Sequence, residues 1–522
     1  MCGILVIFNS EKKKKQLLKP LMRRGPDEKG TFINDDIYMG HTRLSIVNPE
    51  SGPQPIKYKN WVMVINGELY NAKPRFNETD CHMLIKLINK NGPIALQRLD
   101  GIFSFVAYHI PTKRVIIARD PIGVTPLYYS EKIVSSLLTC IEEGTAKPVP
   151  PGHVADFTLG EVPTFQKWTK DYTFEKGPVP NITDLMTNAV SKRLMGDVPW
   201  GVLLSGGLDS TIVAALAQRL ADVKRPDYPI VHSFCIGLRD SPDVAVAEKV
   251  AKQLGTHHTS IRYTVPEGIK AIKNVIKAIE TYDVTTIRAS VPMWLLGKAL
   301  KKRGIKMVLS GEGSDELFAG YLYNLYCPSE KAMEEECIRK LDQLWAYDCL
   351  RANKTMADWG IETRVPFLDN KVVDFAMNKM PAVDKMSGTH PDGAKVEKWW
   401  LREQFRDIVP DYVCDRTKAQ FSDAVGSKWI DVLKKVADKK ISDELFATAS
   451  EKYPYQTPDT KEAFWYRSIF EECFSHIEDG EKTVLYQPSI ACSTGVAAEW
   501  HENFKKYLDP SGDAIHEAFN VS

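Results

Sequence analysis

VLLSGGLDST, residues 202–211, decides the fold of the larger part of this chain. Residues 202–204 have the apolar pattern of a buried strand, and residues 211–220 have the pattern of a helix. Between them, SGGLDS forms a glycine-rich turn that leads into a helix N-terminus. Such a turn binds anions because its backbone N–H groups point at the ligand and the helix dipole favours negative charge. The stretch therefore predicts a phosphate-binding loop in a parallel α/β sheet.

Three side chains in this loop indicate what it binds. Ser205 and Ser210 add hydroxyl donors for phosphate oxygens, whereas the carboxylate of Asp209 suggests a bridging Mg²⁺. The chain contains no G-x-x-x-x-G-K-[ST] sequence, which excludes a Walker A loop. An ordinary glycine-rich turn is the alternative, but the strand before it and the helix after it favour an anion site.

A second loop, LSGEGSDELFAGY (309–321), also follows a strand-like run. Ser310 and Gly311 offer hydroxyl and backbone contacts, and Glu312, Asp315 and Glu316 bring three acids together. In an open α/β sheet this loop would lie at the carboxyl ends of the strands, where ligands bind. A solvated acidic turn is the alternative, which the nearby SGGLDS loop disfavours.

Composition excludes several classes of protein. The 522 residues are 43% hydrophobic and 26% charged, which is typical of a soluble protein with two to four domains. The net charge of +1 does not suggest nucleic acid or an anionic membrane as a partner. Ten scattered cysteines without zinc spacing indicate a reducing compartment. Without an apolar span or an apolar leader, we expect a cytoplasmic protein.

The pattern of apolar and turn residues changes near residue 178. Residues 1 to about 165 carry short apolar runs separated by turn residues, which predicts antiparallel β structure with one helix near 80–91. After the Pro/Gly-rich stretch EKGPVPN (175–181), strands alternate with long helical patterns, as in a parallel sheet. We therefore predict two domains, 1–178 and 179–522.

The start of the chain, MCGILVIF, places a thiol beside the terminus. Removal of Met1 would give Cys2 a free α-amino group, which can act as the general base for the neighbouring thiol. The alternative is that Cys2 is only a small residue that permits removal of Met1.

Motifs along the whole chain resemble one family. RRGPDEKG (23–30), GHTRLSIV (40–47), VINGELYN (64–71) and TDCHMLI (79–85) resemble class II, N-terminal-nucleophile (Ntn) glutamine amidotransferases, and SGGLDS resembles the pyrophosphate loop of N-type ATP pyrophosphatases. With ETYDVTTIRAS (280–290), ETRVPFLD (362–369) and AQFSDAVGSKWID (419–431), the order is similar to that of bacterial and plant glutamine-hydrolysing asparagine synthetases. The resemblance implies a β-rich Ntn sandwich followed by a parallel α/β ATP pyrophosphatase domain.

In the first domain the resemblance implies a glutamine site. Cys2 would attack the glutamine amide to form a thioester, and Asn66 and Gly67 would bind the oxyanion. Arg43 would pair with the glutamine carboxylate and Glu68 and Asp80 with its amino group, as their chemistry suits. The remaining pocket residues implied are Leu44, Ser45, Ile46 and Val47.

In the second domain the resemblance implies ATP-dependent adenylation of the aspartate β-carboxylate. Glu312 matches the residue linked to β-aspartyl-AMP formation, and Asp209 and Asp315 are candidate Mg²⁺ ligands. Arg364 would hold an anion or make a structural ion pair. The residues implied to contact ATP are Leu204, Ser205, Gly206, Gly207, Asp209, Ser210, Ile236, Ser310, Gly311 and Lys418.

The resemblance therefore implies an enzyme that makes asparagine, AMP and diphosphate from aspartate, ATP and glutamine. Its partners would be these small molecules, with no nucleic acid and no membrane, and a homodimer is possible. Alternatives are a related ligase that adenylates another carboxylate, and a regulatory protein that binds without catalysis. The retained Cys2 argues against the related ligase, and Cys2, SGGLDS and Glu312 together argue against the regulatory protein.

The chain departs from the family pattern at several positions. The family's R-H-R-G-P-D is R-R-G-P-D here, its S-S-E is SSL (135–137), and its K-E-Q-F-S-D is KAQFSD with Ala419 in place of the acid. The segments before RRGPD and between ELYN and TDC are also shorter. Most of these changes fall in or beside the first domain, so they concern glutamine use more than adenylation.

Overall fold

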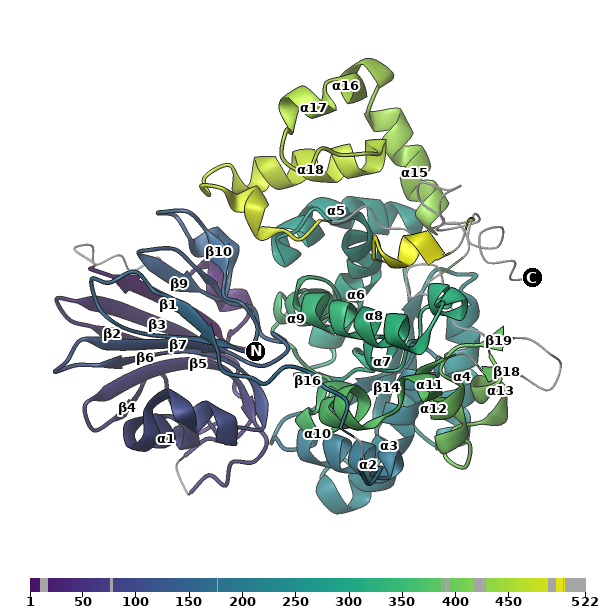
Figure 1. Ribbon diagram of the computed structural model, residues 1–522, viewed down its shortest axis with the longest axis horizontal. Helices are drawn as coiled ribbons and strands as arrows, with labels where there is room; N and C mark the ends of the chain where they lie inside the picture. The colour runs from purple at the N-terminus through teal and green to yellow at the C-terminus, as the bar shows by residue number, and fades with distance from the viewer. Residues whose placement is uncertain are drawn as a thin grey trace.

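The structure is a computed structural model with a β-rich part and a larger helix-rich part, and the N-terminus lies at their junction (Figure 1). It describes residues 1–9, 17–75, 78–175, 177–386, 388–389, 395–416, 426, 429–486, 494–500 and 502.

The β-rich part consists of two six-stranded antiparallel sheets packed face to face (Figure 1). The strand orders are β10-β8-β9-β1-β3-β2 and β12-β11-β7-β6-β5-β4. Alternate residues of facing strands, such as Ile4 in β1 and Val64 in β5, share one buried core, as a period of two requires. The predicted antiparallel sandwich is confirmed. Its strands and helix are β1 (Gly3–Phe8), β2 (Glu28–Ile33), β3 (Ile37–Arg43), β4 (Ile56–Tyr58), β5 (Trp61–Leu69), α1 (His82–Asn91), β6 (Gly101–His109), β7 (Arg114–Arg119), β8 (Tyr128–Tyr129), β9 (Ile133–Ser135), β10 (Lys147–Pro148), β11 (His153–Thr158) and β12 (Phe165–Lys167).

The larger part is built on a five-stranded parallel sheet in the order β15-β14-β13-β16-β17. The chain enters at the central strand β13, adds β14 and β15 on one side, and then returns to add β16 and β17 on the other. The loops after β13 and β16 therefore face each other at the topological switch point, where ligands of such sheets bind. The strands are β13 (Trp200–Leu203), β14 (His232–Gly237), β15 (His257–Arg262), β16 (Met307–Leu309) and β17 (Glu362–Arg364), with a separate pair β18 (Gly388–Thr389) and β19 (Lys395–Val396).

Helices cover both faces of this sheet. Alternate residues of β14 divide between two cores: Cys235 packs with α3 and α4, whereas Phe234 and Ile236 pack with α5 and α6. The helices are α2 (Ile182–Arg193), α3 (Leu208–Lys224), α4 (Pro242–Leu254), α5 (Val265–Ile279), α6 (Val284–Lys302), α7 (Ser314–Leu317), α8 (Glu330–Gln343), α9 (Asp348–Ala357), α10 (Asn370–Asp374), α11 (Ala382–Lys385), α12 (Trp399–Gln404), α13 (Asp411–Cys414), α15 (Trp429–Lys440), α16 (Asp443–Ala447), α17 (Ala449–Lys452) and α18 (Lys461–Phe474). None of the helices in the described ranges is long and apolar enough to cross a membrane.

The helix predicted from residue 211 begins three residues earlier, at Leu208. Gly206 turns the chain with φ 84°, and Gly207 is the extended N-cap, so α3 starts within SGGLDS. Asp209 and Ser210 therefore lie in the first helical turn, where backbone N–H groups have no intrahelical partner.

A buried ion pair joins the two parts of the molecule. Lys354 in α9 donates to Glu280, at 2.5 Å, and to the Tyr128 hydroxyl of β8, at 2.7 Å. Glu280 follows α5 and accepts the backbone N–H groups of Leu138 and Thr139 at 2.8 and 2.9 Å. Lys354 and Glu280 are almost fully buried, so the pair fixes how the antiparallel sandwich meets the parallel sheet.

A second buried ion pair generates a test of how the helices hold together. Arg288 of α6 and Glu462 of α18 meet through two hydrogen bonds of 3.0 and 2.7 Å, and both side chains are 3% exposed. We expect Arg288→Ala to lower the free energy of unfolding by about 3–5 kcal/mol because it leaves a buried carboxylate unpaired. Replacing both residues by Met and Leu removes both charges, so most of the loss is recovered. Urea unfolding followed by tryptophan fluorescence measures both, and equal losses in the two variants would contradict this expectation.

Candidate active sites

The first candidate site surrounds Cys2, immediately before β1. The Cys2 backbone N–H donates to Asn66 Oδ1 at 2.7 Å, and its Sγ lies 3.9 Å from the Leu44 carbonyl oxygen. Asn66 is fully buried, and its Nδ2 has no hydrogen-bond partner among the described residues. A buried donor without a partner is costly. Beside a thiol, such an amide is suited to bind a developing oxyanion.

Gly67 follows Asn66 on β5 in a conformation that requires glycine. Its φ is 148°, and a Cβ atom there would lie 2.0 Å from the Ile102 carbonyl oxygen. The close approach of β6 therefore excludes a side chain at this position. The pairing of β5 with β6 holds this segment in place, and the Asn66 side chain on it meets the Cys2 N–H.

Residues 43–47 form one wall of this site. The Arg43 guanidinium donates to Glu28 at 3.0 Å and to the carbonyls of residues 47–49. The Ser45 backbone N–H donates to Asp27 at 2.8 Å. Leu44 and Ile46 are buried, and Val47 is half-buried. A glutamine carboxylate would therefore have to share Arg43 with protein acceptors.

Two acids complete the site. Glu68 lies 3.4 Å from Arg364 of β17, and Asp80 accepts the Leu69 backbone N–H at 2.7 Å. Burial and the nearby carboxylate of Glu362 raise the pKa of Glu68 well above its usual range. Burial likewise raises the pKa of Asp80 to about 6. A positively charged amino group between them would restore their ionised forms.

Arg364 makes the structural ion pair that was one of its two predicted roles. Its Nε donates to Glu362 at 2.7 Å, and the Glu362 carboxylate also meets the Met1 ammonium at 3.3 Å. The Arg364 carbonyl accepts the Ser310 N–H at 2.9 Å. Arg364 thus connects Glu68 of the first candidate site with the second candidate site.

The second candidate site lies at the switch point of the parallel sheet. Ser205 and Ser210 hydroxyls lie 3.0 Å apart, and the Gly207 N–H donates to Ser205 Oγ at 3.4 Å. A Cβ atom on Gly311 would lie 3.0 Å from the backbone of residues 209 and 210, so the two loops touch. Leu204, Ile236 and Ser310 are buried at the ends of β13, β14 and β16. The structure therefore brings these predicted ATP-binding residues together.

Asp209 and Asp315, the two predicted Mg²⁺ ligands, converge on one cation. The buried ammonium of Lys398 lies 2.7 Å from Asp209 and 2.6 Å from Asp315, and the Ser314 hydroxyl donates to Asp209 at 2.7 Å. Two carboxylates around one positive charge fit Mg²⁺, whose preferred ligands are oxygens. Among the described residues, no group of three or more His, Cys, Asp or Glu could hold a metal ion without help. Phosphate oxygens or water would have to complete the coordination.

Glu312 lies beside these loops and is held by Arg351 of α9, at 2.7 Å. Burial and Asp348 raise the pKa of Glu312, whereas Arg351 opposes the shift. Lys418, predicted near the ATP phosphates, and Ala419 lie outside the described residues. Sequence reasoning missed Lys398 because KVEKWW has no recognised spacing, and it left Arg24 of RRGPD without a role.

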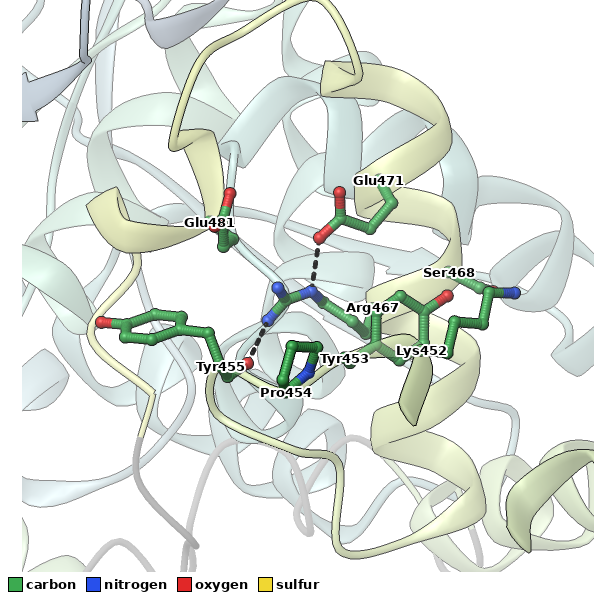
Figure 2. Close-up of a pocket in the computed structure, with 8 residues that line it drawn as sticks. All are labelled: Lys452, Tyr453, Pro454, Tyr455, Arg467, Ser468, Glu471 and Glu481. Carbon is green, nitrogen blue, oxygen red and sulfur yellow. Dashed lines mark hydrogen bonds and ion pairs between the residues drawn. The ribbon is translucent and has the colours of Figure 1, made fainter. Parts of the chain in front are cut away.

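A separate pocket lies among the last helices, between α17 and α18 (Figure 2). It has a volume of about 440 Å³ and contains none of the predicted site residues. The Arg467 guanidinium, one of the groups that line the pocket, donates to Glu471 at 2.7 Å and to the Tyr455 carbonyl oxygen at 3.3 Å. It also stacks on Tyr282, 4.3 Å from the ring centre. These contacts give Arg467 a structural role.

Family models match both parts of the chain. A glutamine amidotransferase domain matches residues 1–149, and an asparagine synthase domain matches residues 181–329 and 326–502. Asparagine synthetase B [glutamine-hydrolyzing] of Escherichia coli (strain K12) is 44% identical, with 99% of each chain covered. The chain belongs to the glutamine-hydrolysing asparagine synthetase family. Asparagine synthetase [glutamine-hydrolyzing] of Zea mays is 41% identical over 99% of this chain and 93% of its own length. Asparagine synthetase [glutamine-hydrolyzing] 2 of Arabidopsis thaliana is 42% identical over 98% of this chain and 94% of its own length.

A histidine of the family-like motif GHTRLSIV generates a test of pH dependence. His41 is fully buried on β3, and its Nε2 lies 3.1 Å from the Ile65 carbonyl oxygen. Burial lowers the pKa of His41 from 6.5 to about 3. Below pH 6.5 His41 is therefore protonated in the unfolded chain, whereas in the folded chain it stays neutral down to about pH 3. Stability present above pH 6.5 is lost as the pH falls through this window.

We expect His41→Gln to flatten the dependence of the unfolding free energy on pH between 6 and 4. The wild-type slope should be steeper by up to about 1.4 kcal/mol per pH unit, the value for one proton. Urea unfolding of both proteins at pH 6, 5 and 4 measures the difference. Identical slopes would mean that His41 is not a buried neutral group.

Proposed function

We propose that this chain makes asparagine from aspartate, using glutamine as the nitrogen donor and ATP as the energy source. The products are L-asparagine, L-glutamate, AMP and diphosphate. Family membership supports the reaction. The observation that carries it is the buried Asn66 amide beside Cys2, whose Nδ2 has no partner among the residues that the structure describes, in a chain whose SGGLDS and SGEGSDE loops meet at the switch point.

At the first site Cys2 is the nucleophile. After removal of Met1, its α-amino group accepts the thiol proton, and the thiolate attacks the side-chain carbonyl carbon of glutamine. Asn66 Nδ2 and the Gly67 N–H stabilise the oxyanion, and collapse of the tetrahedral intermediate releases ammonia and leaves a γ-glutamyl thioester. Water then releases glutamate. Arg43, Glu68 and Asp80 hold the two charged ends of glutamine, and residues 44–47 shape its pocket.

At the second site an aspartate β-carboxylate oxygen attacks the α-phosphorus of ATP, and diphosphate leaves. The SGGLDS loop binds the leaving diphosphate, whose charge the α3 N-terminus and Lys418 stabilise. Leu204, Ile236, Ser310 and Gly311 contact the nucleotide. Glu312 takes part in forming the β-aspartyl-AMP intermediate. Ammonia then attacks the carbonyl carbon of this intermediate, and AMP leaves.

Mg²⁺ supplies charge neutralisation for the phosphates when it is bound. Asp209 and Asp315 would hold it. In the protein without ligands, Lys398 binds both carboxylates and so keeps them directed at one point.

The proposal includes the wider setting of the enzyme. We place the glutaminase domain at 1–178 and the synthetase domain at 179–522, a boundary that falls between β12 and α2. We place the enzyme in the cytoplasm as a possible homodimer, with small molecules as its partners and neither nucleic acid nor membrane.

The test replaces the nucleophile and changes the nitrogen donor. We expect Cys2→Ala to lower glutamine-dependent asparagine formation by at least about a thousandfold, because the covalent route is lost. With ammonium salt, ATP, Mg²⁺ and aspartate, the same variant should keep the wild-type rate of asparagine and diphosphate release. The ammonium reaction is thus the internal control for folding.

Three other outcomes would revise the proposal. Glutamine-dependent synthesis by Cys2→Ala would exclude Cys2 as the nucleophile. If the wild-type chain made asparagine with ammonium but not with glutamine, the shortened first domain would not use glutamine. Diphosphate release with other carboxylates, but no asparagine from either donor, would favour the alternative of a related ligase.

A further inference from the structure

Helix α9 carries side chains that reach both candidate sites. Arg351 donates to Glu312 Oε2 at 2.7 Å. Two residues later, Asn353 Oδ1 accepts a hydrogen bond from Arg24 Nη2 at 3.1 Å, and Arg24 Nε donates to the Cys2 carbonyl oxygen at 2.9 Å. Helix α9 therefore links the two residues proposed to do the chemistry. It reaches Glu312 directly through Arg351, and it reaches Cys2 through Asn353 and Arg24.

The spacing on the helix explains how this is possible. Residues two apart on an α-helix point about 200° apart, so Arg351 and Asn353 leave α9 on nearly opposite sides. The next residue, Lys354, fixes the helix against Glu280 and Tyr128. Because Arg351 and Asn353 belong to the same short helix, a movement of Arg351 caused at Glu312 is transmitted to Asn353.

Arg24 depends on Asn353 for its position. Arg24 and Asn353 are 2% and 1% exposed. Arg24 Nη1 has no hydrogen-bond partner in the described part of the chain, so the guanidinium is held by the Cys2 carbonyl and by Asn353. Asn353 is itself fixed by donating from Nδ2 to the Val124 carbonyl at 2.9 Å. Its amide therefore locks a buried cation against the main chain of the nucleophile.

We propose that Asn353 is a positioning residue that sets the Cys2 main chain through Arg24, and that α9 couples the state of Glu312 to the glutaminase rate. The inference rests on the proposed function, because it assumes that Cys2 and Glu312 act in the two half-reactions. Binding of ATP and aspartate at the Glu312 site then changes the rate at which Cys2 hydrolyses glutamine.

The test compares two variants of the same helix. Asn353→Leu removes, at similar volume, the hydrogen bonds of the amide to Arg24, to the Val124 carbonyl and to the Met1 sulfur, the last at 3.4 Å. The matched control is Thr355→Val, because Thr355 is buried on α9 and its hydroxyl donates only to the Arg351 carbonyl at 2.7 Å. Each protein is assayed for glutamate formation with and without saturating ATP, Mg²⁺ and aspartate, and for asparagine formation from ammonium salt.

We expect Asn353→Leu to lower the glutaminase kcat about tenfold to a hundredfold, as loss of one hydrogen bond to a charged group would. The KM for glutamine should stay unchanged, because Arg43, Glu68 and Asp80 remain. The response of glutaminase to ATP and aspartate should disappear, whereas asparagine formation from ammonium should not change. Asn353→Asp, which keeps an acceptor for Arg24, should restore most of kcat.

The opposite results would overturn the proposal. These are an Asn353→Leu variant that behaves like Thr355→Val, a kcat loss in Asn353→Asp as large as in Asn353→Leu, or a wild-type glutaminase that ignores ATP and aspartate. If Asn353→Leu does not fold, Asn353→Ala takes its place in the comparison with Thr355→Val and Asn353→Asp, with the same expected results. Failure of the proposed function is distinguishable, because then the wild-type chain makes no asparagine from glutamine in the first place.

Discussion

The ammonium of Lys354 is buried between two domains, and it needs partners from both. Glu280 neutralises it, and the same carboxylate accepts the N–H groups of Leu138 and Thr139 in the β-rich part. A buried charge that loses its partner costs several kcal/mol, so only one docking of the two parts leaves these groups satisfied. The arrangement of both candidate sites depends on this constraint.

When the two parts are docked in this way, residues of the helix-rich part contact charged side chains of the site in the β-rich part. Arg364 belongs to the parallel sheet, yet it pairs with Glu68 at the proposed glutamine site, and its carbonyl accepts the Ser310 N–H. Burial without full pairing raises the pKa of Glu68 and Asp80, which prepares both acids for a cationic ligand. His41 on β3 is buried and neutral, so it contributes to the packing of the β-rich part and carries no charge into the site.

Local patterns predicted the framework well and the interface poorly. The strand–loop–helix of SGGLDS and the alternation of the first 165 residues indicated both folds, because those signals depend on neighbours in sequence. The meeting of Cys2 with Asn66 and Gly67 was expected only from a family resemblance. Lys398, in the left-handed conformation at φ 54°, and Asn353 had no local signature, since long-range packing alone gives them partners.

Native-state hydrogen exchange at Leu138 and Thr139 tests the central constraint most directly. Their N–H groups end on Glu280 of the other domain, so we expect them to exchange only when both domains unfold together. Their free energy of exchange should equal that of amides in β13 and β16 at the centre of the parallel sheet. Exchange through a local opening several kcal/mol less costly would show that the Glu280–Lys354 pair does not hold the domains in one arrangement.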